Sequence, residues 1–342
     1  MRWHREVNDR KLPWKGLKDP YRIWLSEIIL QQTRAEQGRP YYERFIAAYP
    51  TVQHLAAATD DEVFRLWQGL GYYNRCRNLL HTARFITDNL GGQFPNTYEG
   101  LLALKGIGSY TAAAIASFAF DLPHAVVDGN VYRVLARYFG LFTPTDSTEG
   151  RNLFSQTADA VLDRNHPGEF NQAIMDHGAT VCTPLAPDCP ACPVQDRCFA
   201  FGNRVIGELP ARSPKAPLRQ RYLHYVVLRC EDQLWLRKRT KGIWSNLYEP
   251  LLIESESPLD RNALQNHPEL SPLLGHASEL EYEGVIHRKL THQALEIRFF
   301  SAVLSTPVIV LAGDGMWIPV SRLGEYPMPK ALELFFAKKD YF

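Results

Sequence analysis

The chain has 342 residues, of which 45% are apolar and 22% are charged, and its formal net charge is +1. This length exceeds that of one ordinary domain, so we expect two. Apolar runs are far shorter than the roughly 20 residues that span a bilayer, and the first residues lack a secretory signal. We therefore expect a cytoplasmic protein without a membrane role. The near-zero charge excludes a general basic field for nucleic acid, so any such contact must come from local clusters and helix ends.

The first part of the chain carries the 3.6-residue apolar spacing of helices, with short turns between them. Trp24, Leu25, Ile28 and Ile29, for example, form one apolar stripe. Helices are predicted over residues 21–37, 41–48, 51–57, 60–68, 75–89, 110–120, 129–138, 149–162 and 169–181.

The pattern changes after residues 207–220, which are rich in Pro and basic residues and are typical of an extended linker. Strands are predicted at 222–229 and 233–238, in a hairpin closed by Glu231 and Asp232, and again at 294–304. A last helix is predicted at 328–338. The fold class is therefore multidomain, with an all-α domain at residues 1–205, a linker at 206–221 and a smaller α+β domain at 222–342.

Four of the six cysteines lie close together in a Pro-rich loop, with the spacing C-x6-C-x2-C-x5-C: Cys182, Cys189, Cys192 and Cys198. Disulfides do not persist in a reducing cytoplasm. Structural zinc is usually held by two paired C-x2-4-C arms, and here one pair is close. The loop 182–198 therefore favours a four-iron, 4Fe-4S cluster, with zinc as the alternative.

Two acidic residues stand out by their positions. Glu27 lies inside the mostly apolar helix at 21–37, where it is either a surface residue or a buried acid. Asp128 precedes the helix at 129–138, where it can act as an N-cap. Cleavage of an N-glycosidic bond needs an acid for the leaving base and an anion for the cationic sugar, and two carboxyl groups in different environments supply both.

A Gly-x-Gly turn, with Gly106 and Gly108, separates an apolar run from the Ala-rich helix at 110–120. Glycines let a phosphate approach the backbone, and the following helix start favours an anion. The alternative is an ordinary C-cap glycine between two core helices. Lys105, directly before the turn, adds a positive charge for phosphate.

These motifs together resemble the endonuclease III superfamily of helix–hairpin–helix DNA glycosylases, and within it the MutY family of adenine glycosylases. The stretches WLSEIILQQTR (24–34), VVDGNVYRVLAR (126–137) and FNQAIMDHGATVC (170–182) carry the resemblance. It extends to the second domain, which in this family is Nudix-like. It implies double-stranded DNA with adenine opposite 8-oxoguanine or guanine as the partner of a monomeric, nucleoid-associated enzyme.

The resemblance also implies roles for single residues. Glu27 and Asp128 take the acid and anion positions. Tyr110 stands where strand-cleaving members of the superfamily have a lysine, so this chain lacks the amine that forms a Schiff base. Arg10, Trp14 and Gln172 are expected to line the adenine pocket.

Two further pairs follow from the same resemblance. Gln32 and Tyr72 are expected to wedge into the duplex where the base is extruded. Thr291 and His292 are expected to read 8-oxoguanine, because a hydroxyl can bond to the altered edge of the lesion.

The sequence thus predicts a monofunctional adenine DNA glycosylase. One rival is a bifunctional, endonuclease III-like pyrimidine glycosylase and lyase, against which Tyr110 argues. The other is a non-catalytic DNA-binding scaffold with a structural cluster, against which Glu27 and Asp128 argue. Nudix-type nucleotide hydrolysis is excluded because the sequence lacks the G-x5-E-x7-RE-x2-EE box that holds magnesium.

Overall fold

The computed structural model describes residues 1–214, 217–274, 277, 279–307 and 315–339. They form two compact units. The first comprises Met1–Ala58 and Arg77–Pro214, and the second comprises Thr59–Cys76 and Lys215–Phe342. Within the described ranges, no helix is long and apolar enough to cross a membrane.

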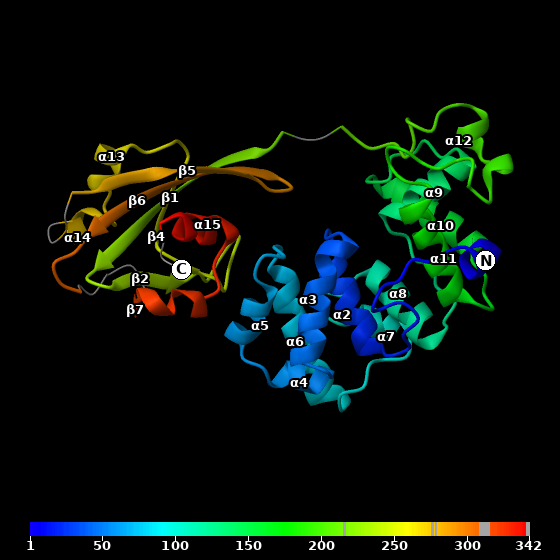
Figure 1. Cartoon of the computed structure of the whole chain (residues 1–342), viewed down its shortest axis with the longest axis horizontal. Coiled ribbons are helices and arrows are strands. Elements are labelled where there is room, and N and C mark those ends of the chain that lie inside the picture. The colour runs from blue at the N-terminus through cyan, green and yellow to red at the C-terminus, as the bar shows by residue number, and fades with distance from the viewer. Residues whose placement is uncertain (215–216, 275–276, 278, 308–314, 340–342) are drawn as a thin grey trace. The chain divides into compact units, whose positions relative to one another are not determined.

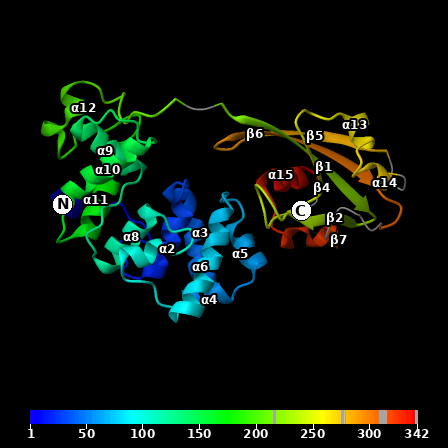
Figure 2. The same cartoon turned by 180° about the vertical axis from the view of Figure 1, so that it is seen from behind.

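The first unit is built of helices, drawn in blue to green in Figures 1 and 2. Its elements are α1 (Arg2–Glu6), α2 (Pro20–Leu30), α3 (Ala35–Ala48), α4 (Val52–Ala57), most of α6 (Asn74–Leu90), α7 (Tyr98–Leu102), α8 (Ser109–Phe120), α9 (Gly129–Phe139), α10 (Thr148–Val161), α11 (Pro167–Thr180), η1 (Gln195–Arg197) and α12 (Phe199–Gly202).

Side-chain caps fix where several of these helices begin. Asp19 accepts hydrogen bonds from the backbone at the start of α2, whose first residue is Pro20. Thr97 caps α7 and Ser147 caps α10 in the same way. The starts of α2, α7 and α10 are therefore set by local sequence.

The predicted helix at 21–37 is wrong in being continuous, because residues 31–34 are not helical and divide it into two helices. Its buried stripe ends at Ile29, and α2 ends at Leu30. The backbone then turns at Gln32, whose φ of 57° is left-handed, before α3 starts at Ala35. The residues of this turn are polar and lack a buried face that would hold them in a continuous helix.

The second unit is centred on a sheet, as the α+β prediction required. Its strands are β1 (Arg219–Cys230), β2 (Gln233–Lys238), β3 (Tyr248–Glu249), β4 (Leu251–Ser255), β5 (Glu281–Lys289), β6 (Gln293–Val303) and β7 (Gly315–Pro319). The described strands run in the order β3-β2-β1-β6-β5, with β4 on β1 and β7 on β2. The pair β1–β6 is parallel and the other pairs are antiparallel, so the sheet is mixed.

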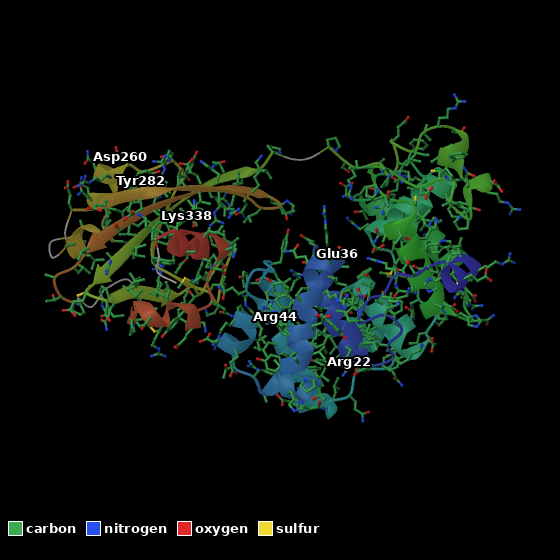
Figure 3. The ribbon with its side chains drawn as sticks, in the orientation of Figure 1. Arg22, Glu36, Arg44, Asp260, Tyr282 and Lys338 are labelled. Carbon is green, nitrogen blue, oxygen red and sulfur yellow. The ribbon has the colours of Figure 1, made fainter. Side chains whose placement is uncertain are left out.

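Helices cover this sheet and complete its core. They are α13 (Arg261–Gln265), α14 (Ser271–Leu274), η2 (Val320–Glu325) and α15 (Lys330–Lys338). Phe335 of α15 stacks on Phe299 of β6 with ring centroids 4.1 Å apart. The outer edge strand β5 instead presents the exposed Tyr282 (Figure 3).

The second unit also contains α5 (Asp60–Trp67), from the first third of the chain. Asp61 of this helix accepts hydrogen bonds from Lys238 at 2.5 Å and from the Tyr248 hydroxyl at 3.1 Å. Gln68 donates to Glu333 of α15 at 2.5 Å. Polar contacts thus tie this segment to β2, β3 and α15.

Candidate active site

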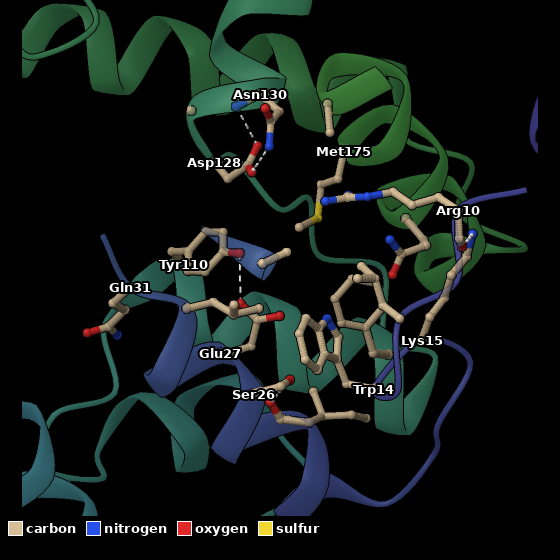
Figure 4. Close-up of a pocket in the computed structure, with 18 of the residues that line it drawn as sticks. Arg10, Trp14, Lys15, Ser26, Glu27, Gln31, Tyr110, Asp128, Asn130 and Met175 are labelled. Atoms are coloured by element: carbon tan, nitrogen blue, oxygen red, sulfur yellow. Dashed lines mark hydrogen bonds between the residues drawn. The ribbon is translucent and has the colours of Figure 1, made fainter. Parts of the chain in front are cut away.

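A cavity of about 1230 Å³ opens in the first unit, lined by α2, the starts of α8 and α9, α11 and the N-terminal segment 10–18. Figure 4 draws Asp128 and Asn130 above Glu27 and Tyr110, with Arg10 and Lys15 entering from one side. All three residues predicted as catalytic, Glu27, Tyr110 and Asp128, line this cavity.

Glu27 is a buried acid rather than a surface residue, since it is 6% exposed within the apolar stripe of α2. Burial raises the pKa of Glu27 to about 7. The Tyr110 hydroxyl, which donates to Glu27 Oε2 at 2.7 Å, opposes this rise, and the charge of Asp128 adds to it. A carboxyl group with a pKa near neutrality can both give and take a proton, as general acid–base catalysis requires.

Asp128 is the N-cap of α9, as its position predicted. Its Oδ1 accepts from the backbone N–H groups of Asn130 at 2.8 Å and Val131 at 2.7 Å, and its Oδ2 accepts from Asn130 Nδ2 at 2.7 Å. Burial raises the pKa of Asp128, while these donors and Arg133 pull it down. Three N–H donors and the positive end of a helix favour the carboxylate form.

Tyr110 lies in the first turn of α8, next to Glu27. Burial, reinforced by the charge of Glu27, raises the pKa of Tyr110 well above its usual value, so the phenol keeps its proton and donates it in a hydrogen bond.

Two lysines also line the cavity, and both form ion pairs. Lys15 contacts Asp176 at 2.9 Å, and Lys18 contacts Asp121 at 2.7 Å.

The glycine turn lies between α7 and α8, and its residues Lys105, Gly106 and Gly108 are exposed. Gly106 has φ +79°, and a Cβ there would lie 2.6 Å from the Cβ of Asn78. A side chain at Gly106 is therefore doubly disfavoured. Gly108 is the N-cap of α8, with open space where its Cβ would be.

The predicted pocket residues Arg10, Trp14 and Gln172 line the same cavity. Trp14 is 9% exposed and packs edge-on against Tyr42, with ring centroids 5.2 Å apart. Arg10 and Gln172 both donate to Asp176, an acid that the sequence analysis did not single out.

The predicted wedge residues share an unusual backbone. Gln32 has φ 57° and Tyr72 has φ 49°, and both side chains are exposed, Tyr72 to 49%. In the second unit, Thr291 and His292 are exposed in the turn between β5 and β6. Tyr72 belongs to the same unit, and its hydroxyl group lies 3.1 Å from that of Thr291.

Four cysteines, Cys182, Cys189, Cys192 and Cys198, line one small cavity of about 30 Å³. Burial raises the pKa of Cys189 and Cys192, and the neighbouring thiols add to the rise. Arg137 Nη1 donates to Cys182 Sγ at 3.4 Å, and His177 Nε2 lies 3.4 Å from Cys192 Sγ. In the part of the chain that the structure describes, no three His, Cys, Asp or Glu side chains are grouped to hold a single metal ion.

Comparison with known proteins shows the family of this chain. The HhH-GPD superfamily of base excision DNA repair proteins matches residues 25–155, and the NUDIX domain matches residues 224–338. The adenine DNA glycosylase of Buchnera aphidicola subsp. Schizaphis graminum is 36% identical over 250 residues, which cover 72% of each chain. The chain belongs to the adenine DNA glycosylase family. Because its superfamily acts in base excision DNA repair, DNA is the partner of this chain.

Other known proteins are similar over less of their length or of this chain. The adenine DNA glycosylase of Mus musculus is 43% identical over 62% of this chain and 42% of its own. A thermostable thymine-DNA glycosylase has 29% identity and a TM-score of 0.53, over 58% of this chain and 91% of that chain. Endonuclease III in a trapped covalent complex with DNA has a TM-score of 0.51 at 22% identity. The match covers 59% of this chain and 92% of that chain and shows a shared fold.

Sequence reasoning missed three residues that shape the cavity or contact the residues that line it. Asn130 adds a side-chain donor to Asp128, and Lys15 and Asp176 form the ion pair on the other side of the cavity. Asn130 could have been found, because it lies within the quoted stretch 126–137. Asp176 has partners far away along the chain, so no local pattern marks it.

Proposed function

We propose that this chain is a monofunctional glycosylase of base excision repair that hydrolyses the N-glycosidic bond of adenine opposite 8-oxoguanine or guanine. One observation carries the proposal: a single cavity brings together Glu27 and Asp128, two carboxyl groups in different environments. Glu27 is buried with a pKa of about 7, and Asp128 is held by three N–H donors. Cleavage of a glycosidic bond needs one carboxyl group as an acid for the leaving base and a second as an anion for the cationic sugar.

The reaction proceeds on a flipped adenosine bound in this cavity. Protonated Glu27 gives its proton to adenine at N7, and the C–N bond breaks with its electron pair leaving on the base. Asp128 stabilises the oxocarbenium-like sugar that remains. Water then adds to the sugar, its proton returns to Glu27, and an abasic site is left. Arg10, Trp14 and Gln172 hold the base.

The residue beside Glu27 supports a monofunctional enzyme. Tyr110 takes the place of the lysine found in strand-cleaving relatives, and its phenol is bonded to Glu27. The cavity lysines Lys15 and Lys18 are engaged in ion pairs with Asp176 and Asp121, so neither amine is free to attack the sugar. A Schiff base with the abasic sugar is therefore disfavoured.

The DNA contacts are spread over both units. Lys105, Gly106 and Gly108 offer exposed backbone and a positive charge to phosphate. Gln32 and Tyr72 project from left-handed turns and fill the space of the extruded base. Thr291 and His292 read the lesion from an exposed hairpin turn.

Cys182, Cys189, Cys192 and Cys198 would hold a 4Fe-4S cluster. The fit rests on four thiols around one cavity, in a loop that Arg137 binds through the carbonyl groups of Thr183 and Pro184. Such a cluster supplies a rigid cross-link for the loop and a site for one-electron exchange.

The protein works as a monomer in the cytoplasm, held on the nucleoid by its contacts with DNA. One polypeptide carries the base pocket and the hairpin turn assigned to lesion reading, which supports a monomer.

A single-turnover assay on a duplex with adenine opposite 8-oxoguanine tests the proposal. We expect adenine release, with strand breakage only after hot alkali. Breakage without alkali, together with borohydride trapping of the enzyme on DNA, would establish the bifunctional rival. Binding without release of adenine would leave the DNA-binding scaffold.

A further inference from the structure

Asp176, on α11, is a fully enclosed carboxylate of the first unit, with an exposed fraction of 0%. Four side chains donate to it. Arg10 Nη1 (2.9 Å) and Gln172 Nε2 (3.1 Å) reach Oδ1, whereas Asn8 Nδ2 (2.8 Å) and Lys15 Nζ (2.9 Å) reach Oδ2. The pKa of Asp176 is lowered, because the hydrogen bonds from Lys15, Asn8 and Arg10 outweigh its burial. Asp176 is thus an ionised group that can accept hydrogen bonds and cannot donate them.

Because Asp176 only accepts hydrogen bonds, it determines which end of the Gln172 carboxamide faces it. Gln172 lies one helical turn before Asp176, so the two side chains face each other. A carboxamide has a donor end and an acceptor end, and only the donor end can face a carboxylate that donates nothing. The nitrogen of Gln172 is therefore committed to Asp176, and its oxygen is left for the cavity, which Gln172 lines.

We propose that Asp176 is a positioning residue that makes the base pocket selective for a 6-amino purine by fixing the carboxamide oxygen of Gln172 as an acceptor toward the base. The inference rests on the proposed function, since it needs adenine in this cavity. The exocyclic amine of adenine donates to that oxygen. A 6-oxo purine presents a second acceptor there, and two facing acceptors repel each other without a shared proton.

The test compares adenine with hypoxanthine, which carries oxygen where adenine carries the exocyclic amine. Each base is placed opposite 8-oxoguanine in the same duplex, and single-turnover release is measured for both. The readout is the ratio of the two rates, normalised to the wild-type ratio. A loss that is merely structural slows both substrates equally and leaves this ratio unchanged.

Asp176→Asn replaces the pure acceptor by a group that also donates, so the carboxamide of Gln172 can turn over. We expect the adenine-to-hypoxanthine ratio to fall about tenfold or more. Asn8→Ala is the matched control, because Asn8 donates to Oδ2 of Asp176 whereas Gln172 donates to Oδ1. Its ratio should stay at the wild-type value even if both rates fall.

The double variant Asp176→Asn with Gln172→Glu again pairs one amide with one carboxylate, but the carboxylate is now at position 172. A carboxylate at position 172 can only accept, and the amide introduced at position 176 donates to it, so the ratio should return to within about threefold of wild type. Gln172→Leu removes the acceptor itself and should also lower the ratio about tenfold, because the side chain then no longer distinguishes an exocyclic amine from an oxygen. This variant keeps the charge of Asp176, so it tests the role of the acceptor even if Asp176→Asn does not fold.

The outcomes separate the two claims. A wild-type protein that releases no adenine refutes the proposed function, and the inference with it. Adenine release by the wild type with an unchanged ratio in folded Asp176→Asn refutes the positioning role alone. An unchanged ratio in Gln172→Leu also refutes it, because the oxygen that Asp176 is proposed to position would then not read the base.

Discussion

Replacement of Glu27 by Gln should stabilise the folded chain at alkaline pH. Burial raises the pKa of Glu27 from its ordinary value of 4.5 to about 7. The folded state therefore binds this proton more tightly than the unfolded state does. That stabilisation is complete below pH 4.5 and is lost as the pH rises through 7.

The size of the effect follows from the two pKa values. At about 1.36 kcal/mol per pH unit, the rise from 4.5 to about 7 corresponds to an upper limit of about 3 kcal/mol. Gln is neutral at every pH and matches protonated Glu in shape. The free energy of unfolding of Glu27→Gln should thus equal that of wild type near pH 4.5 and exceed it by up to about 3 kcal/mol at pH 8.

Urea unfolding at pH 5 and pH 8, followed by tryptophan fluorescence, measures this difference. Glu149→Gln is the control, because Glu149 is an exposed carboxylate in the first turn of α10. It controls for the loss of an exposed carboxylate and should not reproduce the gain in stability at pH 8. If Glu27→Gln also showed no gain at pH 8 relative to pH 5, the burial of an ionisable Glu27 would be refuted.

Three further predictions follow from the site. Asp128→Asn keeps an N-cap for α9 but removes the negative charge, so single-turnover adenine release should fall about 10²-fold or more with little change in melting temperature; an unimpaired rate would exclude Asp128 as the stabilising anion. Gly106→Ala should cost about 1–2 kcal/mol in urea unfolding and weaken DNA binding, because its φ of +79° disfavours a side chain and Asn78 is too close; wild-type stability would contradict the observed turn. Cys198→Ser should lower the iron content and the visible absorbance of the purified protein, and full iron content would exclude Cys198 as a ligand.

The sequence predicted those parts of the site that are marked locally. Asp128 precedes an apolar helical pattern, and Gly106 and Gly108 precede an Ala-rich one, so caps and turns could be recognised from neighbouring residues. The hairpin of β1 and β2 is also local and was predicted correctly around Glu231, whose φ is 51°. Short-range physics decides these features.

Long-range features were not accessible in the same way. Asn8 and Arg10 lie 168 and 166 positions before Asp176, so their network exists only in the folded chain. The left-handed turn at Gln32 follows the last buried residue of the α2 stripe, Ile29, and the sequence alone does not show where that stripe loses its cover. The burial of Glu27 was left open for the same reason, because spacing alone does not show what covers a helix face.

The central claim is that Glu27 is the acid that protonates the leaving adenine. The most direct test is single-turnover adenine release by Glu27→Gln from a duplex with adenine opposite 8-oxoguanine, with DNA binding measured on the same preparation. We predict binding close to that of wild type and a rate at least about 10²-fold lower, since the carboxamide cannot give up a proton. A release rate near that of wild type would contradict the assignment of Glu27.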